Sequence, residues 1–430
     1  MSGGAMRVGL LGCGNVGAAV IRLLDEHAAD IARRAGCRLE VARVAVRDPS
    51  RARDVPLDPA RITGDPMAVV EDPEVDIVCE LIGGSEPAGS LILAAFERDK
   101  PVVTANKELL ATRGRELFDA SDARGLDLYF EAAVGGGIPL IRPLKESLTG
   151  ERVRRVMGIV NGTTNFILTK MADEGRAFAE VLAEAQALGY AEADPTADVE
   201  GHDAAAKCAI LASIAFNARV TAADVFREGI ATVTPQDIEF ARRLGYVVKL
   251  LAIAELVEGE RIAARVHPAM IPARHPLAAV RDAYNAVFVE GDRIGELMFY
   301  GRGAGGDATA TAVVGDLVSV ARNLQSGARG VGCTCFHERT IRPMSEMEGQ
   351  YYILTSVEDR PGVLAEIAGV FGRNQVSLKS MWQEGMGDEA QLVFITHRAR
   401  EGAFQDAVAG IRELGAVREV RSVLRVEAEE

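Results

Sequence analysis

Three charged side chains occupy positions where a purely structural role is unexpected. Lys107 follows an apolar, strand-like run and opens a helical stretch, although a cation in the first turn of a helix opposes the helix dipole. Asp203 and Lys207 lie one turn apart in the segment 201–216, which is otherwise apolar almost all the way round. Because burying such charges costs several kcal/mol per ion before any pairing, we expect them to handle protons.

A glycine fingerprint stands near the N-terminus, between a strand-like run at 6–11 and a helical run at 18–24. In this context the pattern predicts a dinucleotide site, because the glycines allow a tight turn, a close approach to the pyrophosphate and close packing of helix on strand. The residues of this segment expected to contact the cofactor are Gly12, Gly14, Asn15, Val16 and Gly17.

The ends of three further predicted strands extend this site. Arg47 suits a ribose 2′-phosphate, whereas the neighbouring Asp48 suits a free 2′-hydroxyl. Because both are present, the sequence favours NADP and leaves NAD open. Gly83 and Thr104 also end strands, at the carboxyl edge where ligands bind in such sheets.

The order of elements predicts more than one kind of domain. Strands alternate with helices up to about residue 131, which indicates an α/β, doubly wound Rossmann domain with a parallel sheet. Helices and then meandering strands follow, as in an α+β unit, and the last elements run β-α-β-β-α-β, the ferredoxin-like motif. We predict a dinucleotide-binding domain at 1–135 completed by a helix at 305–324, an α+β domain at 136–304, a linker at 325–349 and a ferredoxin-like domain at 350–430.

Composition narrows the class of partner and the compartment. The chain has 430 residues and a net charge of −14, which argues against nucleic acid or an anionic membrane as a partner. Six cysteines lack disulfide or zinc spacing, and Cys333-Thr334-Cys335 lacks the two-residue spacer of metal and redox pairs. No apolar run reaches membrane-spanning length and no basic leader precedes the first strand, so we expect a cytoplasmic protein.

Taken together, the motifs resemble those of the homoserine dehydrogenase family, in its longer form with a C-terminal ACT regulatory domain. They occur in family order over about residues 6–320, and the run Gly189–Lys207 is highly specific. The turn Asp359-Arg360-Pro361-Gly362 is similar to the one that leads into a helix in ACT domains. The matching segments are Gly12–Gly17, Thr104–Lys107, Glu131–Pro139, Asn161–Asn165, Gly189–Lys207, Gly301–Gly305 and Asp359–Leu364.

The resemblance implies reversible, NAD(P)-dependent interconversion of L-homoserine and L-aspartate 4-semialdehyde in threonine, methionine and isoleucine synthesis. By this resemblance Lys207 is the proton donor to the aldehyde oxygen, Asp203 orients substrate and lysine, and Lys107 lies near both cofactor and substrate. Glu192 binds the substrate amino group and Asp198 belongs to the substrate site. By the same resemblance, residues 136–304 form the substrate-binding and dimerisation domain. Gly303 and Gly305 complete the cofactor site.

The same resemblance implies further ligands. A sodium ion is expected near Glu131, Val134, Gly136 and Ile138, held largely by backbone carbonyls, which suit a hard cation. L-Threonine is the expected effector, bound where two ACT domains pair, in a homodimer or homotetramer. The residues expected to bind it are Asp359, Gly362, Val363 and Asn374.

Two other functions remain in view. A different nicotinamide dehydrogenase with an ACT domain, acting on a hydroxy acid, needs a catalytic His or Arg in the sheet domain, and the six histidines offer no obvious candidate. A catalytically silent amino-acid sensor has no need to keep two such cations as Lys107 and Lys207.

Overall fold

The chain divides into two compact units. The computed structural model describes residues 4–53, 55, 57–385 and 388–427. The first unit holds the described residues of Met1–Val156, Ala206–Asp224 and Asn285–Arg339, and the second those of Met157–Ala205, Val225–Tyr284 and Thr340–Glu430. The chain passes between them inside strand β7 (Val153–Ile159) and inside helix α9 (His202–Ala215), among other places.

The first unit is built on a parallel sheet in the order β3-β2-β1-β4-β5-β6. This is a doubly wound parallel sheet, as the alternating sequence pattern predicts. The order in which successive strands are added reverses between β1 and β4, and such sheets bind ligands at that point. The strands are β1 (Met6–Leu11), β2 (Leu39–Ala45), β3 (Ile62–Thr63), β4 (Ile77–Glu80), β5 (Val102–Thr104) and β6 (Leu128–Tyr129).

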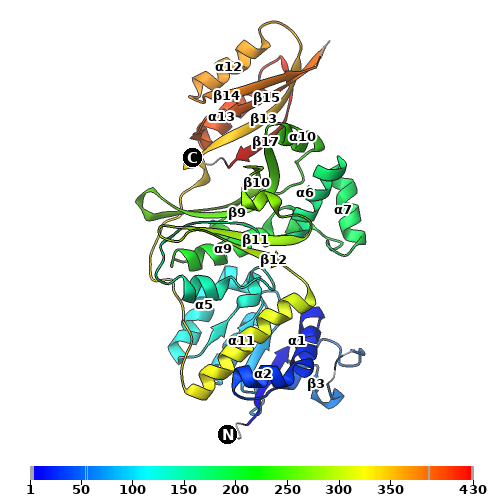
Figure 1. Cartoon of the computed structure of the whole chain (residues 1–430), viewed down its shortest axis with the longest axis vertical. Coiled ribbons are helices and arrows are strands. Elements are labelled where there is room, and N and C mark those ends of the chain that lie inside the picture. Colours follow the sequence, from blue (N-terminus) through cyan, green and yellow to red (C-terminus); the bar gives the residue numbers. More distant parts are fainter. Residues whose placement is uncertain (1–3, 54, 56, 386–387, 428–430) are drawn as a thin grey trace. The chain divides into compact units, whose positions relative to one another are not determined.

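Helices cover this sheet, which is drawn in blue to cyan in Figure 1. The last helix of the unit, α11, packs against α1 and α2 although it follows them by almost 300 residues, and its buried Val313, Leu317 and Val320 join the core of β1 and β2. The helices are α1 (Asn15–Glu26), α2 (Ala28–Ala35), α3 (Met67–Val70), α4 (Ala88–Glu97), α5 (Lys107–Arg124) and α11 (Gly306–Ser326). Strands β11 (Tyr284–Gly291) and β12 (Gly295–Arg302) precede α11.

One predicted strand is shorter than expected. The sequence predicts a strand over 126–131, but β6 covers only Leu128–Tyr129 and a 3-10 turn follows at Glu131–Ala133. The reason is that the backbone amide of Glu131 donates to the carboxylate of Asp316 on α11, at 2.8 Å, so it leaves the sheet.

The second unit contains a sheet in the order β9-β10-β17-β13-β15-β14. Its long hairpin, β9 (Tyr246–Val257) with β10 (Arg261–Pro272), pairs antiparallel over twelve residues of each strand. The other strands are β8 (Phe226–Arg227), β13 (Glu348–Glu358), β14 (Leu378–Glu384), β15 (Glu389–Thr396), β16 (Ala399–Arg400) and β17 (Val417–Val426). The helices are α6 (Gly162–Glu174), α7 (Phe178–Ala187), α8 (Thr196–Val199), α10 (Pro235–Arg243), α12 (Val363–Arg373) and α13 (Glu401–Arg412).

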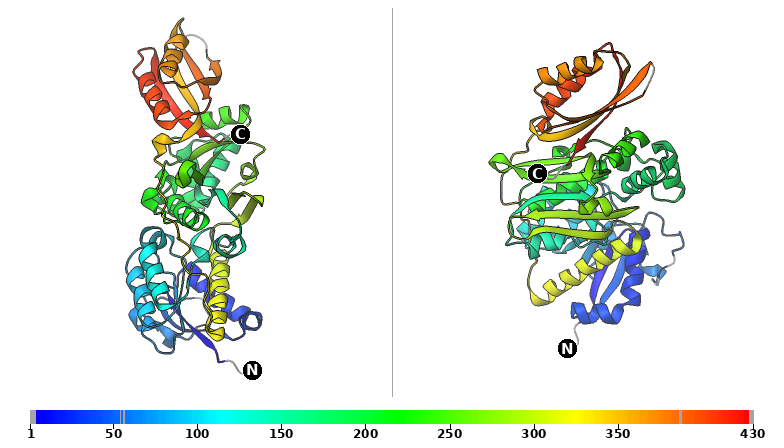
Figure 2. Two further views of the ribbon diagram at one scale, coloured as in Figure 1. Left: turned by 90° about the vertical axis from the view of Figure 1, so that its left-hand side faces the viewer. Right: turned by 45° about the horizontal axis from the view of Figure 1, so that its top comes forward.

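The C-terminal elements confirm the predicted β-α-β-β-α-β order. Helices α12 and α13 lie together on one face of β13, β15 and β17, in orange and red in Figure 2. Their shared core includes the stacked rings of Tyr351 and Phe404. The predicted linker is short of regular structure as well, because α11 ends at Ser326 and β13 begins at Glu348 with one 3-10 turn between them. Within the described part of the chain, none of the helices is long and apolar enough to cross a membrane.

Candidate active site

The turn between β1 and α1 has the geometry of a pyrophosphate site. Gly12 has φ +107°, and a Cβ there would lie 2.8 Å from the carbonyl oxygen of Leu81. A Cβ on Gly17 would lie 2.3 Å from the carbonyl oxygen of Gly12, whereas Gly14 has open space within 4 Å. Gly14 also caps α1 without a side chain, and the first turn of α1 carries no acidic residue. The positive end of α1 therefore suits an anion, with Asn15 and Val16 in its first turn.

A buried carboxylate joins the ends of β4 and β5. Glu80 is fully buried, and its Oε1 accepts hydrogen bonds from the amides of Ile82 and Gly83 at 2.8 and 3.0 Å. Its Oε2 accepts from the Thr104 hydroxyl at 2.6 Å. Glu80 thus fixes the loop that contains Gly83. Thr104 contributes by holding the carboxylate of Glu80 in place.

The loop after β5 is fixed by an asparagine. The side-chain amide of Asn106 donates to the carbonyl of Gly84 at 2.7 Å, and its Oδ1 accepts from the amide of Leu109 at 3.1 Å. Asn106 therefore caps α5, whose first residue is the half-buried Lys107. The lysine sits at the carboxyl edge of the sheet, as the sequence predicts.

The end of β2 presents more than one cation. Arg47 is exposed directly after the strand, and the carboxylate of Asp48 accepts from the amide and hydroxyl of Ser50 at 2.9 and 2.5 Å. These hydrogen bonds hold the pKa of Asp48 below its usual range. Arg53 donates to the Asp48 carbonyl at 2.9 Å. The carboxylate is thus engaged locally, while the segment 47–53 gathers three arginines.

A second glycine loop approaches the first turn of α11. A Cβ on Gly136 would lie 2.6 Å from the carbonyl oxygen of Gly303, and a Cβ on Gly303 would overlap the side chain of the buried Asn285. The amide of Gly137 donates to the carbonyl of Arg302 at 3.3 Å. This close packing fixes the exposed Gly305, which has φ +121° and precedes α11.

The residues expected around a sodium ion lie in one buried turn. Val134, Gly136 and Ile138 are buried, and the carboxylate of Glu131 accepts three amide hydrogen bonds, from residues 140, 141 and 142, at 2.5 to 2.9 Å. Because that carboxylate is engaged, the oxygens left for a cation are main-chain carbonyls, which suit a hard ion. In the described parts of the chain there is no cluster of three or more His, Cys, Asp or Glu side chains able to hold a metal.

Asp316 lies beside this turn and is almost fully buried. Besides the amide of Glu131, it accepts a hydrogen bond from the Arg142 guanidinium at 2.8 Å. Burial raises the pKa of Asp316 to about 7, with the charge of Glu131 acting in the same direction. The group is thus placed to hold the turn to α11.

Two predicted acids of the second unit share one asparagine. The amide of Asn161, which is 5% exposed, donates to Asp198 Oδ1 at 2.6 Å and to Asp203 Oδ2 at 2.9 Å. Its Oδ1 accepts from the amide and hydroxyl of Thr164, both at 2.9 Å, and so caps α6. Each hydrogen of one NH2 group therefore holds one carboxylate, which fixes both acids relative to α6.

Helix α9 carries both Asp203 and Lys207, one turn apart. Asp203 is half-buried in the second unit, and Lys207, 9% exposed, belongs to the first unit. The residues around Lys207 on this helix are buried and apolar, as the sequence predicts. Glu192 is exposed in the loop after α7.

The predicted effector residues separate along one helix. Asp359 and Gly362 are exposed before α12, and Val363 buries its side chain in the core of the C-terminal elements, which leaves its main chain for a ligand. Asn374 caps the other end of α12 and donates to the carbonyl of Val370 at 2.9 Å. Since α12 has 11 residues, its ends are about 16 Å apart, so one copy does not bring Asn374 to Gly362.

Sequence reasoning gave no role to two residues that organise these sites. Glu80 could have been found as the one acid inside the apolar run 77–82. Asn161 stands between an apolar strand and Gly162, where its residue type indicates a helix cap, but its contact with two distant acids has no sequence signal.

A cavity of about 290 Å³ in the first unit lies apart from all these residues. It is mostly apolar and lined by residues of α5 and α9 together with Lys145, Arg219 and Cys333-Thr334-Cys335. None of the residues expected to bind substrate, cofactor or effector lines it.

Models of known protein families match the chain in three consecutive segments. The family models described as "Homoserine dehydrogenase, NAD binding domain", "Homoserine dehydrogenase" and "ACT domain" match residues 12–131, 139–318 and 351–416. Homoserine dehydrogenase of Mycobacterium bovis is 50% identical over 98% of this chain and 97% of its own length. That of Corynebacterium glutamicum is 49% identical over 99% and 96%.

Solved structures agree. A crystal structure of a homoserine dehydrogenase from Thiobacillus denitrificans superposes with a TM-score of 0.94 at 43% identity and covers 100% of both chains. A hyperthermophilic archaeal homoserine dehydrogenase in complex with NADPH gives a TM-score of 0.63 at 26% identity, covering 76% of this chain and 99% of its own. The chain therefore belongs to the homoserine dehydrogenase family and carries a C-terminal ACT domain.

Proposed function

We propose that the chain catalyses the NAD(P)-dependent interconversion of L-homoserine and L-aspartate 4-semialdehyde, with Lys207 as the proton donor and acceptor. The observation that carries the assignment of roles is the pair on α9: a buried ammonium one turn after a carboxylate that Asn161 holds in place. A nicotinamide cofactor, when bound, accepts or supplies the hydride at carbon.

The residues of the chain act on the oxygen and on the substrate's charges. In the reducing direction the carbonyl oxygen gains alkoxide character, and the ammonium of Lys207 stabilises that charge and gives it a proton. In the oxidising direction the same amine accepts the hydroxyl proton. We assign Asp203 to orienting substrate and lysine, Lys107 to the region shared by cofactor and substrate, and Glu192 and Asp198 to substrate binding.

We further propose that NADP is the preferred cofactor. The support is that Arg47 is exposed at the end of β2 with Arg51 and Arg53 close in sequence, while the competing carboxylate of Asp48 is engaged by Ser50. A relative of known structure was solved with NADPH. Steady-state rates with NADP+ and NAD+ test this, and Arg47→Ala should raise KM for NADP+ about ten-fold while leaving KM for NAD+ unchanged.

A sodium ion bound by the main-chain carbonyls of Glu131, Val134, Gly136 and Ile138 is part of the proposal. The support is the buried turn of hard oxygen donors that Glu131 and Asp316 fix. A thermal unfolding temperature that rises in NaCl but not in an equal concentration of tetramethylammonium chloride would agree with this site.

We propose L-threonine as the effector and self-association of the chain, as a dimer or tetramer, as the state that binds it. Asp359, Gly362 and Val363 of one copy would join Asn374 of a second copy, since α12 separates them within one chain. Trp382, the only tryptophan, is 45% exposed on β14 of this domain, so threonine titration followed by its fluorescence reports binding. No change in emission or in activity would contradict the proposal.

The central experiment is homoserine-dependent formation of NADPH, followed by absorbance at saturating cofactor. We expect turnover with L-homoserine and none with 2-hydroxy acids that lack the amino group. A chain that oxidises such a hydroxy acid and leaves L-homoserine unchanged would overturn the assignment. A cytoplasmic location completes the proposal, supported by six cysteines that are all free thiols.

A further inference from the structure

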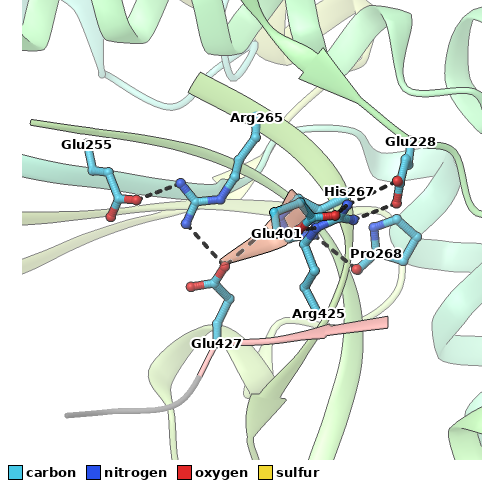
Figure 3. A network of polar contacts seen from close by, with 8 residues as sticks. All are labelled: Glu228, Glu255, Arg265, His267, Pro268, Glu401, Arg425 and Glu427. Atoms are coloured by element: carbon cyan, nitrogen blue, oxygen red, sulfur yellow. Dashed lines mark hydrogen bonds and ion pairs between the residues drawn. The ribbon is translucent and has the colours of Figure 1, made fainter. Parts of the chain in front are cut away.

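A network of ion pairs around two buried arginines, Arg265 and Arg425, lies inside the second unit (Figure 3). Its members come from β9 and β10, from β17 and the residue after it, from the segment after β8 and from the start of α13. Strand β10 pairs in parallel with two strands along one edge. β8 pairs at Arg265 and Val266, and β17 pairs at Ala269 and Met270. The same edge of β10 thus holds two strands in succession. The first is β8, from the part proposed to bind substrate, and the second is β17, the last strand of the ACT domain.

Arg425 of β17 is the centre of this network. Its side chain is 7% exposed, and Nε and Nη2 donate to Glu401 of α13 at 3.0 and 2.6 Å. Nη1 and Nη2 also donate to the two carboxylate oxygens of Glu228 at 2.6 and 3.1 Å. One planar guanidinium therefore holds two carboxylates in a paired geometry, one from the ACT domain and one from the segment after β8.

Glu228 leads directly to the substrate loop. Its amide donates to the carbonyl of Val266 on β10 at 2.7 Å, so main chain and side chain are both anchored. A Cβ on the next residue, Gly229, would lie 2.3 Å from the carbonyl oxygen of Val199. The amide of Ile230 donates to that same carbonyl at 2.9 Å. The segment 228–230 thus rests on the main chain at the end of α8.

That resting point adjoins both acids that Asn161 holds. Asp198 precedes Val199, and the amide of Gly201 donates to the Asp198 carbonyl at 3.0 Å. Gly201 has φ +82°, and its nearest neighbours include the carbonyl oxygen of Glu228. Asp203 follows in the first turn of α9. A shift of Glu228 therefore moves the main chain that carries Asp198 and Asp203.

We infer that Arg425 and Glu228 are positioning residues for the substrate acids: the guanidinium of the ACT domain's last strand fixes the 228–230 segment, which fixes the 198–203 loop. This inference rests on the proposed function and adds to it a physical route between the regulatory domain and the substrate site. An effector that shifts β17 or α13 acts on substrate binding through this pair.

The experiment compares Arg425→Met, Glu228→Gln and the double variant with the full-length wild type. We expect KM for L-homoserine to rise about five-fold or more, with KM for the nicotinamide cofactor unchanged. The double variant should be no worse than Arg425→Met alone, because Arg425→Met already removes the pair that Glu228→Gln removes. Arg425→Lys should restore part of the effect, since lysine keeps the charge and loses the paired geometry.

A second readout does not depend on the substrate. Amide hydrogen exchange should become faster at 199–203 and at Ile230 in both single variants. Because the side chain of Glu228 is 43% exposed, Glu228→Gln is the variant that keeps the fold if Arg425→Met does not. Glu255→Gln is the matched control, because it breaks a similar pair, with Arg265 at 2.6 Å, on the β9 side of the same strand.

The outcomes separate the two claims. A wild type that does not oxidise L-homoserine contradicts the proposed function and leaves the exchange measurement as the test of this inference. An active wild type whose Glu228→Gln variant keeps its KM and its exchange rates overturns the inference. The same holds if Glu255→Gln produces equal changes in KM and in exchange at 199–203, because the effect is then one of general stability.

Discussion

At the scale of single residues, the charges buried in this chain have specific partners. Glu80 is held by two amides and a hydroxyl, Glu131 by three amides, and Asn161 divides its amide hydrogens between two acids. Buried polar groups without such bonds would destabilise the fold. These residues therefore support the site by orientation, while we propose Lys207 as the group that transfers the proton.

The first prediction concerns that lysine. Lys207→Ala should lower kcat by about a hundred-fold or more while KM for L-homoserine changes little, because a general acid acts mainly in the transition state. Lys170→Ala is the control, since Lys170 forms a surface pair with Glu174 and should not alter kcat. Steady-state kinetics in both directions provide the measurement. Turnover equal to that of the wild type in Lys207→Ala would remove the proposed mechanism.

The second prediction concerns the cysteine pair at the cavity. A hydrogen bond from the Cys335 thiol, together with its amide and the charge of Arg219, lowers the pKa of Cys333 against the opposing effect of burial. Cys333 should therefore react with iodoacetamide about ten-fold faster than an ordinary cysteine.

Peptide mapping after brief alkylation is the measurement for that prediction. Cys79 is the internal control, because complete burial raises the pKa of its thiol and shields it. In Cys335→Ala, Cys333 should remain labelled but more slowly, since the thiol donor is lost and only the amide of residue 335 remains. Equal labelling of Cys79 and Cys333 in the folded wild type would show that the pair has no special reactivity.

At the scale of elements, the turn between β1 and α1 gives each glycine a different task. Gly14→Ala meets open space, so it should leave the unfolding temperature unchanged and raise KM for the nicotinamide cofactor about ten-fold by obstructing the pyrophosphate. Gly17→Ala meets the carbonyl oxygen of Gly12 at 2.3 Å, so it should lower the unfolding temperature by several degrees. Calorimetry and cofactor titration together separate the two effects.

If both variants change stability and leave the cofactor KM unaltered, the turn is structural only. Glu26→Ala serves as the control, because Glu26 is exposed in the last turn of α1, away from the glycine turn.

The elements were predictable where local pattern decides them. Alternating strands and helices gave the parallel sheet, and the β-α-β-β-α-β order gave the ACT domain, because both depend on hydrophobic periodicity. The strand predicted at 126–131 was too long, since the amide of Glu131 pairs with Asp316, 185 residues further on. The role of Asn161 also depends on distant partners, Asp198 and Asp203, which no local pattern encodes.

At the scale of the whole molecule, the ACT domain shares a sheet and an ion network with the rest of the second unit. β17 pairs with β10, and Arg425 forms an ion pair with Glu228. Glu427 accepts a hydrogen bond from the guanidinium of Arg265 at 3.2 Å. Removing one partner from such a buried set leaves an uncompensated charge, which is far more costly than the pair is stabilising. The stability of this unit therefore depends on contacts made by the ACT domain.

This arrangement makes stability sensitive to acid through His267, which lies fully buried on β10 between the charges of Arg265 and Arg425. Burial, and then those two cations, lower the pKa of His267 to about 3 in the folded chain, against about 6.5 unfolded. Below pH 6.5 His267 binds a proton in the unfolded chain and stays neutral in the folded chain. The free energy of unfolding therefore falls as the pH falls. Between pH 7 and pH 5 this one group should lower the free energy of unfolding by about 2 kcal/mol.

Urea unfolding of the wild type and of His267→Gln at both pH values measures this change. Because glutamine does not titrate, the free energy of unfolding of the variant should decline less than that of the wild type by that amount. Equal declines in the two proteins would mean that His267 is protonated in the folded chain, with Glu427 as its partner.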